Sequence, residues 1–270
     1  MPLAVWGGLL QYPVLMYLVA TGQFVSALVS ACACYLLFLN RHRLHGCLLI
    51  RIPDESLYSC NGDTIGPGIH LLHPHALFTE GLFVYAQMNL GHFHPVLCID
   101  KHLYYLSPLG MVFLRMSGLE SAPLIHAQIK DYLAQGRTLI LSPGGFLEAA
   151  AYTRDKETLY LHMYPYWMRM AREYSCDVFT TFGYNLASRY FQQSSLLREV
   201  RTALAKRNLP GILPSGLSGT PFEEPIYMYT QQIHPHTDTL DTIRASMRKT
   251  IDKHEKTHGT RISYVIRTTV

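Results

Sequence analysis

The chain has 270 residues, enough for one long domain or two small ones, and 49% of them are apolar, which is ample for a core. Charged residues make up only 16%, against a usual quarter, and this low fraction favours contact with a membrane. The net charge of +4 fits a surface resting on anionic headgroups and is too weak and scattered to indicate a nucleic-acid partner. The six cysteines lack zinc-site spacing, so we expect reduced thiols in a protein that faces the cytosol.

The first 40 residues contain no charged side chain and no histidine. Pro13–Leu39 exceeds the roughly 20 helical residues that cross a hydrocarbon core. We expect a membrane-embedded helix here, or a hairpin broken near Thr21–Gln23; a buried core helix is the alternative. Because Arg41–Arg43 follows directly, the positive-inside rule places the remainder in the cytosol. The sequence therefore predicts a membrane anchor over residues 1–43 and a cytosol-facing domain over residues 44–270.

Beyond this anchor, short β-rich runs alternate with amphipathic segments. The expected strands are Leu44–Ile52, Gly68–Leu72, Pro95–Ile99, Thr138–Leu141 and Val178–Phe182. The expected helices are Phe78–Asn89, Pro108–Ser117, Pro123–Gln135, one opening in Phe146–Tyr152, Leu159–Tyr174 (kinked or split at Pro165), and one capped by Asp238 that runs to about His258, with Asp241 in its first turn. Leu209–Pro225 is expected to be a loop. This alternation predicts an α/β fold with a mostly parallel sheet covered on both faces.

One segment at the end of an expected strand, His73–Glu80, reads HPHALFTE. A neutral imidazole is well matched to taking a proton from a hydroxyl near pH 7. A carboxylate can hold such a ring in the right tautomer and stabilise the imidazolium that forms. Glu80 lies one helical turn beyond His75 and is able to reach back to its ring. Catalysis and simple capping of backbone groups by His73 and His75 are both open on these grounds.

A second segment, Ser142–Glu148, reads SPGGFLE and follows a short apolar run. Gly144 and Gly145 let the backbone turn sharply and approach a substrate closely. Backbone donors in such a turn are suited to stabilising the oxyanion of a tetrahedral intermediate. An ordinary turn is the alternative. Glu148 either orients a group in the site or caps a helix.

Together these segments resemble the type 2 diacylglycerol acyltransferase family of the lysophospholipid-acyltransferase-like superfamily. His73–Ala76 is similar to the HPHG block of that family, and Ser142–Ala149 is similar to its PGGxxE block. Val178–Asn185 resembles the strand that members write as VPVFSFGEN. Gly219–Ile226 and the helix ending in Lys253–Lys256 resemble the closing region.

The resemblance spans about Ile69 to Gly259 and implies a glycerol-phosphate-acyltransferase-like sheet flanked by helices. His75 and Glu80 copy the H-x4-D spacing of the superfamily, with Glu for Asp, which implies that His75 is the general base and Glu80 its orienting partner. The other residues that the resemblance places in the site are His73, which shapes the turn or contacts the acceptor, and the oxyanion- or substrate-binding Gly144, Gly145, Glu148, Asn185 and Arg169. Acyl-CoA is the implied co-substrate, and neither a metal nor a further cofactor is expected.

The chain departs from the family pattern at three places. Ala76 replaces a glycine, Tyr164–Trp167 replaces a basic stretch, and Tyr184 replaces a glutamate. The favoured hypothesis is an acyl-CoA-dependent O-acyltransferase of lipid metabolism, such as triacylglycerol synthesis, that acts on a mono- or diacylglycerol or a long-chain alcohol. We expect it in the endoplasmic reticulum membrane, its partners being acyl-CoA, a lipid acceptor and the bilayer, with a homo-oligomer left open and no nucleic acid.

Two alternatives remain. A lysophospholipid acyltransferase is favoured if Arg115 or Arg154 lies beside His75. A catalytically degenerate, lipid-binding membrane protein is favoured by the altered Tyr164–Trp167 stretch, whereas retention of His75 and Glu80 argues against it.

Overall fold

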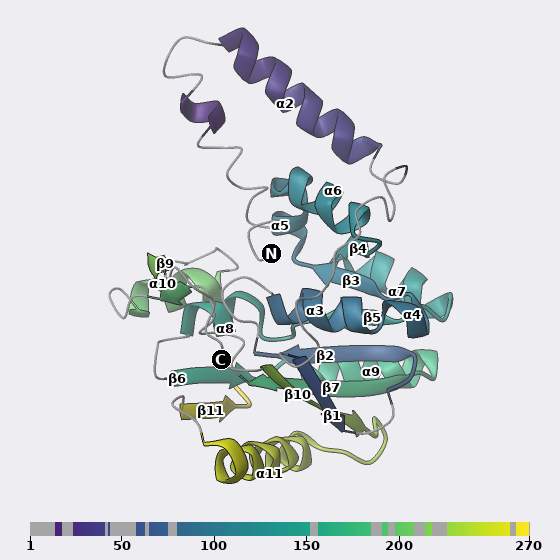
Figure 1. The fold of residues 1–270 in the computed structure, drawn as a ribbon. Coiled ribbons are helices and arrows are strands. Elements are labelled where there is room, and N and C mark those ends of the chain that lie inside the picture. Colours follow the sequence, from purple (N-terminus) through teal and green to yellow (C-terminus); the bar gives the residue numbers. More distant parts are fainter. Residues whose placement is uncertain are drawn as a thin grey trace.

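A computed structural model of the protein shows an α/β fold in which a mostly parallel sheet is flanked by helices, as the sequence predicts (Figure 1). The structure describes residues 14–17, 24–40, 43, 58–62, 65–74, 80–151, 156–184, 191–193, 198–207, 214–217, 226–259 and 263–269. The expected strand Leu44–Ile52 lies outside these residues.

The central sheet has seven strands in the order β1-β10-β7-β2-β5-β3-β4. Neighbouring strands are parallel except for the antiparallel pair of β10 and β7. The strands are β1 (Tyr58–Gly62), β2 (Gly68–His73), β3 (Val96–Ile99), β4 (Glu120–Pro123), β5 (Leu139–Leu141), β7 (Asp177–Tyr184) and β10 (Ile226–Ile233). Two small sheets pair β6 (Lys156–Tyr160) with β11 (Ser263–Arg267) and β8 (Phe191–Gln193) with β9 (Pro214–Leu217).

The helices are α2 (Phe24–Leu39), α3 (Glu80–Met88), α4 (Leu90–Phe93), α5 (Lys101–Leu106), α6 (Pro108–Met116), α7 (His126–Ala134), α8 (Gly145–Ala151), α9 (Tyr164–Tyr174), α10 (Arg198–Lys206) and α11 (Leu240–His258). Residues of α7, α9 and α11 pack on one face of the central sheet and residues of α3, α5 and α6 on the other, whereas α2 lies apart from the sheet (Figure 1).

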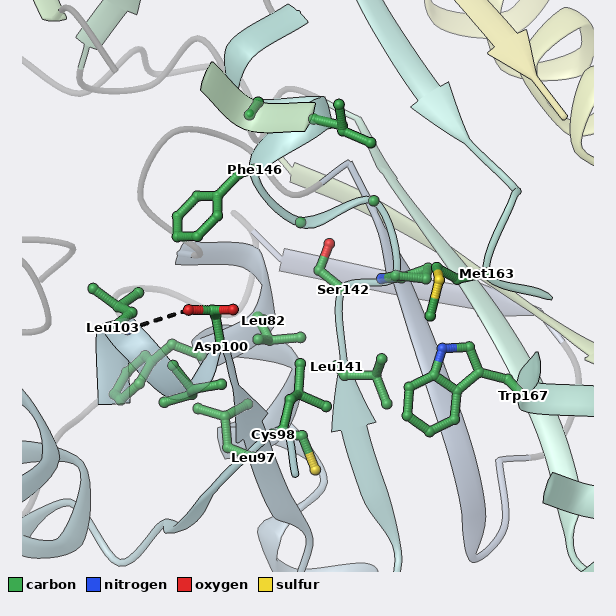
Figure 2. Close-up of a pocket in the computed structure, with 18 of the residues that line it drawn as sticks. Leu82, Leu97, Cys98, Asp100, Leu103, Leu141, Ser142, Phe146, Met163 and Trp167 are labelled. Carbon is green, nitrogen blue, oxygen red and sulfur yellow. Dashed lines mark hydrogen bonds between the residues drawn. The ribbon is translucent and has the colours of Figure 1, made fainter. Parts of the chain in front are cut away.

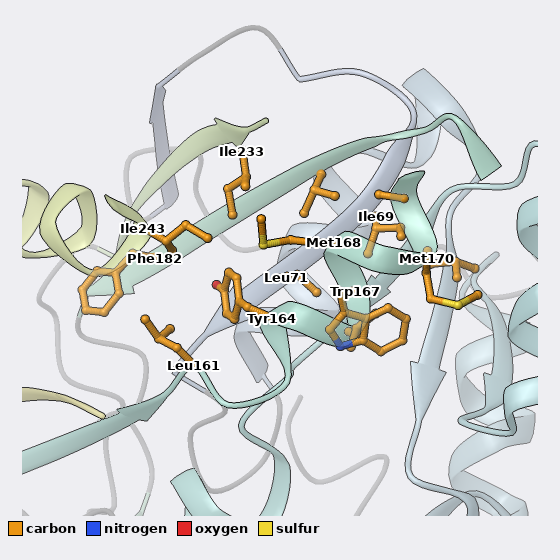
Figure 3. Packing of buried hydrophobic residues seen from close by; sticks show 14 of the residues in the cluster. Ile69, Leu71, Leu161, Tyr164, Trp167, Met168, Met170, Phe182, Ile233 and Ile243 are labelled. Carbon is orange, nitrogen blue, oxygen red and sulfur yellow. The ribbon is translucent and has the colours of Figure 1, made fainter. Parts of the chain in front are cut away.

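Alternation along β2 divides the core into two clusters, because successive side chains of a strand point to opposite faces. Ile69 and Leu71 pack with residues of α7, α9 and α11. Leu72 faces the other way and packs with residues of α3, α5 and α6. Figure 3 shows the first cluster, where Trp167 and Met168 of α9 lie over the β2 side chains. His73 follows Leu71 in this alternation, so its side chain belongs to the α9 face.

Several predicted boundaries are wrong for identifiable reasons. Leu159–Tyr174 is divided, because β6 runs to Tyr160 and α9 begins only at Tyr164; Pro165 therefore lies in the first turn of the helix, which tolerates proline, and makes no kink. The helix expected from Pro123 begins at His126, because Pro123 ends β4 and Ile125 is still extended.

Asp238 does not cap the last helix. Thr239 does, with its side chain accepting from the backbone N–H of Thr242, while the Asp238 carboxylate accepts from the backbone N–H of His234. Asp241 lies in the first turn, as expected. Strand β9 falls inside Leu209–Pro225, of which the structure describes only that strand.

Helix α2 lies in the expected anchor and packs on the domain near its end. Phe38 is buried, and its ring meets that of Tyr104 edge-on with the centroids 5.9 Å apart. Large apolar side chains elsewhere on α2 are exposed: Leu28, Val29, Tyr35, Leu36, Leu37 and Leu39. Within the described part of the chain, none of the helices combines the length and the apolar character needed to cross a membrane.

Candidate active site

The predicted blocks meet at the carboxyl edge of the parallel strands. His73 is the last residue of β2, and Ser142 follows the last residue of β5. Asp100 follows β3 at the same edge. These strands are direct neighbours, since β5 pairs with both β2 and β3. Open α/β sheets bind ligands outside the carboxyl ends of their strands, so a ligand site is expected at this edge.

A buried histidine–carboxylate pair lies at this edge. The Nδ1 atom of His73 is 2.6 Å from Oε1 of Glu148, and the two residues are 0% and 3% exposed. The backbone N–H of Tyr160 donates to the same oxygen over 2.9 Å. Glu148 lies in the first turn of α8, where its own N–H bonds to the carbonyl of Gly144. Of the two interpretations left open for Glu148, the geometry supports the one in which it orients another group.

The second nitrogen of the His73 ring is also occupied. Nε2 lies 3.0 Å from the hydroxyl of Tyr164, and that hydroxyl lies 2.6 Å from Oγ1 of Thr180. Burial raises the pKa of Tyr164 above its ordinary value, so the hydroxyl keeps its proton. The result is a continuous buried chain of four side chains, Glu148, His73, Tyr164 and Thr180.

Gly144 is what allows this chain to close. A Cβ atom at this position would lie 2.0 Å from Cδ of Glu148, far inside contact distance. Only glycine therefore lets the backbone turn pass so close to the carboxylate. Gly145 has a φ of +48°, in the left-handed region that glycine adopts without strain. The two glycines of the predicted block are therefore needed for different reasons: Gly144 because Glu148 lies so close, and Gly145 because its φ is positive.

The same turn lines a cavity of about 260 Å³. Its walls come from β3, β5, α3, α6, α8 and α9 and are mostly apolar; Figure 2 shows Phe146, Leu141 and Trp167 around it. Cys98 also lines it, and burial raises the pKa of this thiol to about 12, so it is not a ready nucleophile.

Three buried polar atoms in this lining have no hydrogen-bond partner among the described residues. They are Oγ of Ser142, Nδ1 of His162 and Nε1 of Trp167. Burial lowers the pKa of His162; the charge of Glu148 opposes the shift and His73 adds to it. The His162 ring is therefore neutral near pH 7. Buried polar groups normally find partners, so three such atoms around one cavity are notable.

Not every predicted site residue is part of this arrangement. His75 and Asn185 lie outside the described residues. The residues directly before them, Pro74 and Tyr184, lie at this edge. Glu80 begins α3, but its side chain is not described. Arg169 is exposed on α9, and its guanidinium carbon lies 5.6 Å from the ring centroid of Tyr166, away from the cavity lining.

The structure adds residues that the sequence did not single out. Tyr164 and Trp167 belong to the stretch that departs from the resembled family, and both are buried at the site. Thr180 lies within the family-like strand Val178–Asn185 but has no predicted role there, and His162 lies outside every motif. The spacing of residues along the sequence does not predict these contacts, because they form between separate elements: α9, β7 and the turn before α9.

Arg115, which would favour a phosphate-bearing acceptor if it lay beside His75, is on α6. It lines a different cavity, of about 750 Å³, with Tyr35 and Glu120 between α2 and the domain. Arg154 lies outside the described residues. Among the described residues, no three or more potential metal ligands lie close enough together to bind an ion.

Comparison of the chain with protein-family models, with curated proteins and with solved structures gave no match in any of the three.

Proposed function

We propose that this protein is an acyl-CoA-dependent O-acyltransferase that moves a fatty acyl group to the hydroxyl of a neutral lipid. The observation that carries the proposal is the buried His73–Glu148 pair, which joins the two segments on which the resemblance rests. His73 and Glu148 are 75 positions apart in the chain. Parallel pairing of β2 with β5 brings both motifs to the same edge, and the buried contact between their side chains supports a shared role.

In this proposal His75 remains the general base, with Glu80 as its orienting partner. His73 is fully buried and both of its ring nitrogens are engaged, so it is a positioning residue. Its bonds to Glu148 and Tyr164 fix the end of β2, from which the chain continues through Pro74 to His75. A general base must reach the proton that it removes, and a fixed turn makes that approach reproducible.

The reaction balances without any other group. The acceptor hydroxyl loses its proton to the neutral imidazole of His75 as its oxygen bonds to the thioester carbonyl carbon. The tetrahedral intermediate then breaks its bond to sulfur, and the CoA thiolate takes the proton back from the imidazolium. Backbone N–H groups of the Gly144–Gly145 turn are our proposed donors to the oxyanion.

We also propose the anchor over residues 1–43 and a glycerol-phosphate-acyltransferase-like fold facing the cytosol at the endoplasmic reticulum. The exposed apolar side chains of α2 support the membrane part, because a soluble surface rarely presents so many together. A degenerate lipid-binding protein is the second candidate, supported by the burial of Tyr164 and Trp167 where the family has basic residues.

The test is transfer of labelled acyl groups from acyl-CoA in microsomes that contain the full chain. Monoacylglycerol, diacylglycerol, a long-chain alcohol and lysophosphatidate would be supplied as separate acceptors, with the His75→Ala variant at matched expression as control. Ester formation on a neutral acceptor that His75→Ala abolishes would support the proposal. Binding of the same lipids without any product would favour the degenerate protein, and product on lysophosphatidate alone would favour the phospholipid enzyme.

A further inference from the structure

The cavity beside the Gly144–Gly145 turn combines an apolar wall with three buried hydrogen-bonding atoms that have no partner among the described residues. Trp167 is 2% exposed, and its Nε1 offers a donor. Ser142 Oγ both donates and accepts, and His162 Nδ1 accepts or donates according to its tautomer. A buried group without a partner carries the full cost of its lost hydration, so each of these atoms favours a ligand that supplies a partner.

The charges around the cavity narrow the choice of ligand. No lysine or arginine occurs among the described residues that line it, whereas Asp100 does. The Asp100 carboxylate caps α5, accepting from the backbone N–H groups of His102 and Leu103 over 2.9 and 3.3 Å. Figure 2 shows the bond with Leu103. Asp100 lies in the same lining as Phe146. The Asp100 side chain is 34% exposed, and Nδ1 of His102 lies 3.4 Å from its carboxylate. A phosphate or a free carboxylate in the cavity would lie near this like charge and, among the described lining residues, would find no lysine or arginine, which is unfavourable.

The volume limits how much of a ligand the cavity holds. A cavity of roughly 150 Å³ accommodates benzene, so the 260 Å³ found here suits about ten non-hydrogen atoms. That is the hydroxyl-bearing end of a lipid with a few methylene groups, and the rest of a longer chain must lie outside.

We infer that this cavity is a binding site for the hydroxyl-bearing end of an uncharged amphiphile, held by Ser142, His162 and Trp167. Monoacylglycerol and long-chain alcohols belong to this class, and lysophosphatidate does not. That the ligand is the acyl acceptor rests on the proposed function; that it binds rests on the cavity alone. Gly144 lines this cavity, and a Cβ atom on it would meet Glu148, which is not among the lining residues.

Intrinsic fluorescence reports on this cavity directly. The chain has two tryptophans, so Trp6→Phe leaves Trp167 as the sole tryptophan, which is excited selectively at wavelengths that the tyrosines do not absorb. The full-length single-tryptophan protein, in detergent micelles and without acyl-CoA, would be titrated with 1-monodecanoylglycerol, decanol, decane and decanoyl-lysophosphatidate. We expect a saturable change in emission with the first two and at least tenfold weaker binding of the lysophosphatidate. Equal or tighter binding of the lysophosphatidate, or of decane relative to decanol, would overturn the inference.

Two variants test the polar atoms, and one serves as a matched control. Ser142→Ala and His162→Phe each remove one unpartnered atom at the cavity, and Thr158→Val removes one that is buried elsewhere. All three should keep or raise the melting temperature, because a buried unpaired group is lost. Only the first two should weaken decanol binding, by about three- to tenfold each, the value of one hydrogen bond. Unchanged binding in both would overturn the inference.

The two proposals fail in different ways. Binding as described with no acyl transfer to any acceptor would contradict the proposed function and leave the binding site intact. Acyl transfer to monoacylglycerol that is unaffected by Ser142→Ala and His162→Phe, with unchanged binding, would contradict the binding site and leave the proposed function intact.

Discussion

The Nδ1 atom of His73 lies 2.6 Å from Oε1 of Glu148, and that oxygen also accepts the backbone N–H of Tyr160. The carboxylate is therefore held from two sides in a buried place, with α8 fixing its backbone. Moving it would leave a ring nitrogen and a backbone donor without partners, each at a cost of about 1–3 kcal/mol. The end of β2 is thus fixed to the turn after β5 by one short contact, and the chemistry proposed for the next histidine depends on it.

The first prediction separates the roles of the two histidines. His75→Ala should lower acyl transfer by about 10²–10⁴-fold, the usual worth of a general base, while the melting temperature stays close to that of the unmodified protein. His73→Ala should lower activity less, and it should also lower the melting temperature, because Glu148 loses its partner. Glu80→Gln should cost less than His75→Ala, and Glu80→Asp least. Initial rates at saturating acyl-CoA and melting curves provide the two readouts. A stable His73→Ala variant that is less active than His75→Ala would reverse the assignment.

A second prediction concerns the far end of the buried chain. Tyr164→Phe removes the hydroxyl between His73 Nε2 and Thr180 Oγ1, leaving both without this partner. The free energy of unfolding should fall by about 1–3 kcal/mol, measured by chemical denaturation. Tyr166→Phe is the matched control, because its hydroxyl bonds to His126 at the surface and should cost less than about 0.5 kcal/mol. Equal losses in the two variants would show that the buried chain contributes nothing.

A third prediction tests the close approach at the glycine turn. Gly144→Ala places a methyl group against the Glu148 side chain and must displace it from His73. We expect both activity and melting temperature to fall. Gly91→Ala serves as control, since no atom lies within 4 Å of its added Cβ and alanine favours the helix. If Gly144→Ala changed activity and melting temperature no more than Gly91→Ala does, the close approach of Gly144 to Glu148 would not matter for function.

Much of the fold follows from local pattern. Gly68–Leu72 and Thr138–Leu141 are buried on both faces and read as apolar runs, and both are strands within a residue of the predicted limits. Helix α6 begins at Pro108 as expected, because proline suits a first helical turn. The missed strands are different. Among them, β10 carries three consecutive polar residues, Thr230–Gln232, and is antiparallel to its partner β7, and β11 pairs with β6 away from the main sheet.

The site was only partly accessible from sequence. The motifs pointed to His73, Gly144 and Glu148, and the structure brings all three together. That Glu148 would contact His73 did not follow, because their separation along the chain is closed only by the pairing of β2 with β5. In the sequence Tyr164 stands only as a departure from a basic stretch, whereas in the structure its hydroxyl joins His73 to Thr180. Long-range side-chain contacts depend on packing, which local spacing does not encode.

A fourth prediction concerns membrane attachment. Deleting residues 1–40 should remove the protein from carbonate-washed membranes, because the exposed apolar side chains of α2 are lost with the segment. Some affinity for lipid vesicles should remain, since the domain keeps its apolar cavity. Fractionation of the full-length and truncated chains at matched expression is the measurement. A full-length protein that never enters the washed membrane fraction would contradict the anchor.

The last prediction concerns the pH dependence of stability, which His70 should govern in part. Its ring lies between those of Phe93 and Phe179, and its nitrogens bond to the Tyr85 hydroxyl and the Gly66 carbonyl. Burial lowers the pKa of His70 to about 4 from 6.5. Between these values the unfolded chain binds a proton that the folded protein does not. The free energy of unfolding should therefore decrease as pH falls from about 6.5 to 4, by about 1.4 kcal/mol per pH unit for this group.

His70→Phe isolates this contribution. Phenylalanine keeps the stacking on the two neighbouring rings and loses the hydrogen bonds, so the variant should be less stable near neutral pH. Its free energy of unfolding should nevertheless fall less steeply as the pH decreases. The two slopes should differ by about 1.4 kcal/mol per pH unit, the contribution of one proton. His254, whose pKa burial also lowers to about 4, is unchanged in both proteins and cancels in the comparison. Denaturation midpoints at half-unit steps from pH 7 to 4 give both slopes. Parallel curves for the two proteins would mean that His70 takes up its proton equally in the folded and unfolded states.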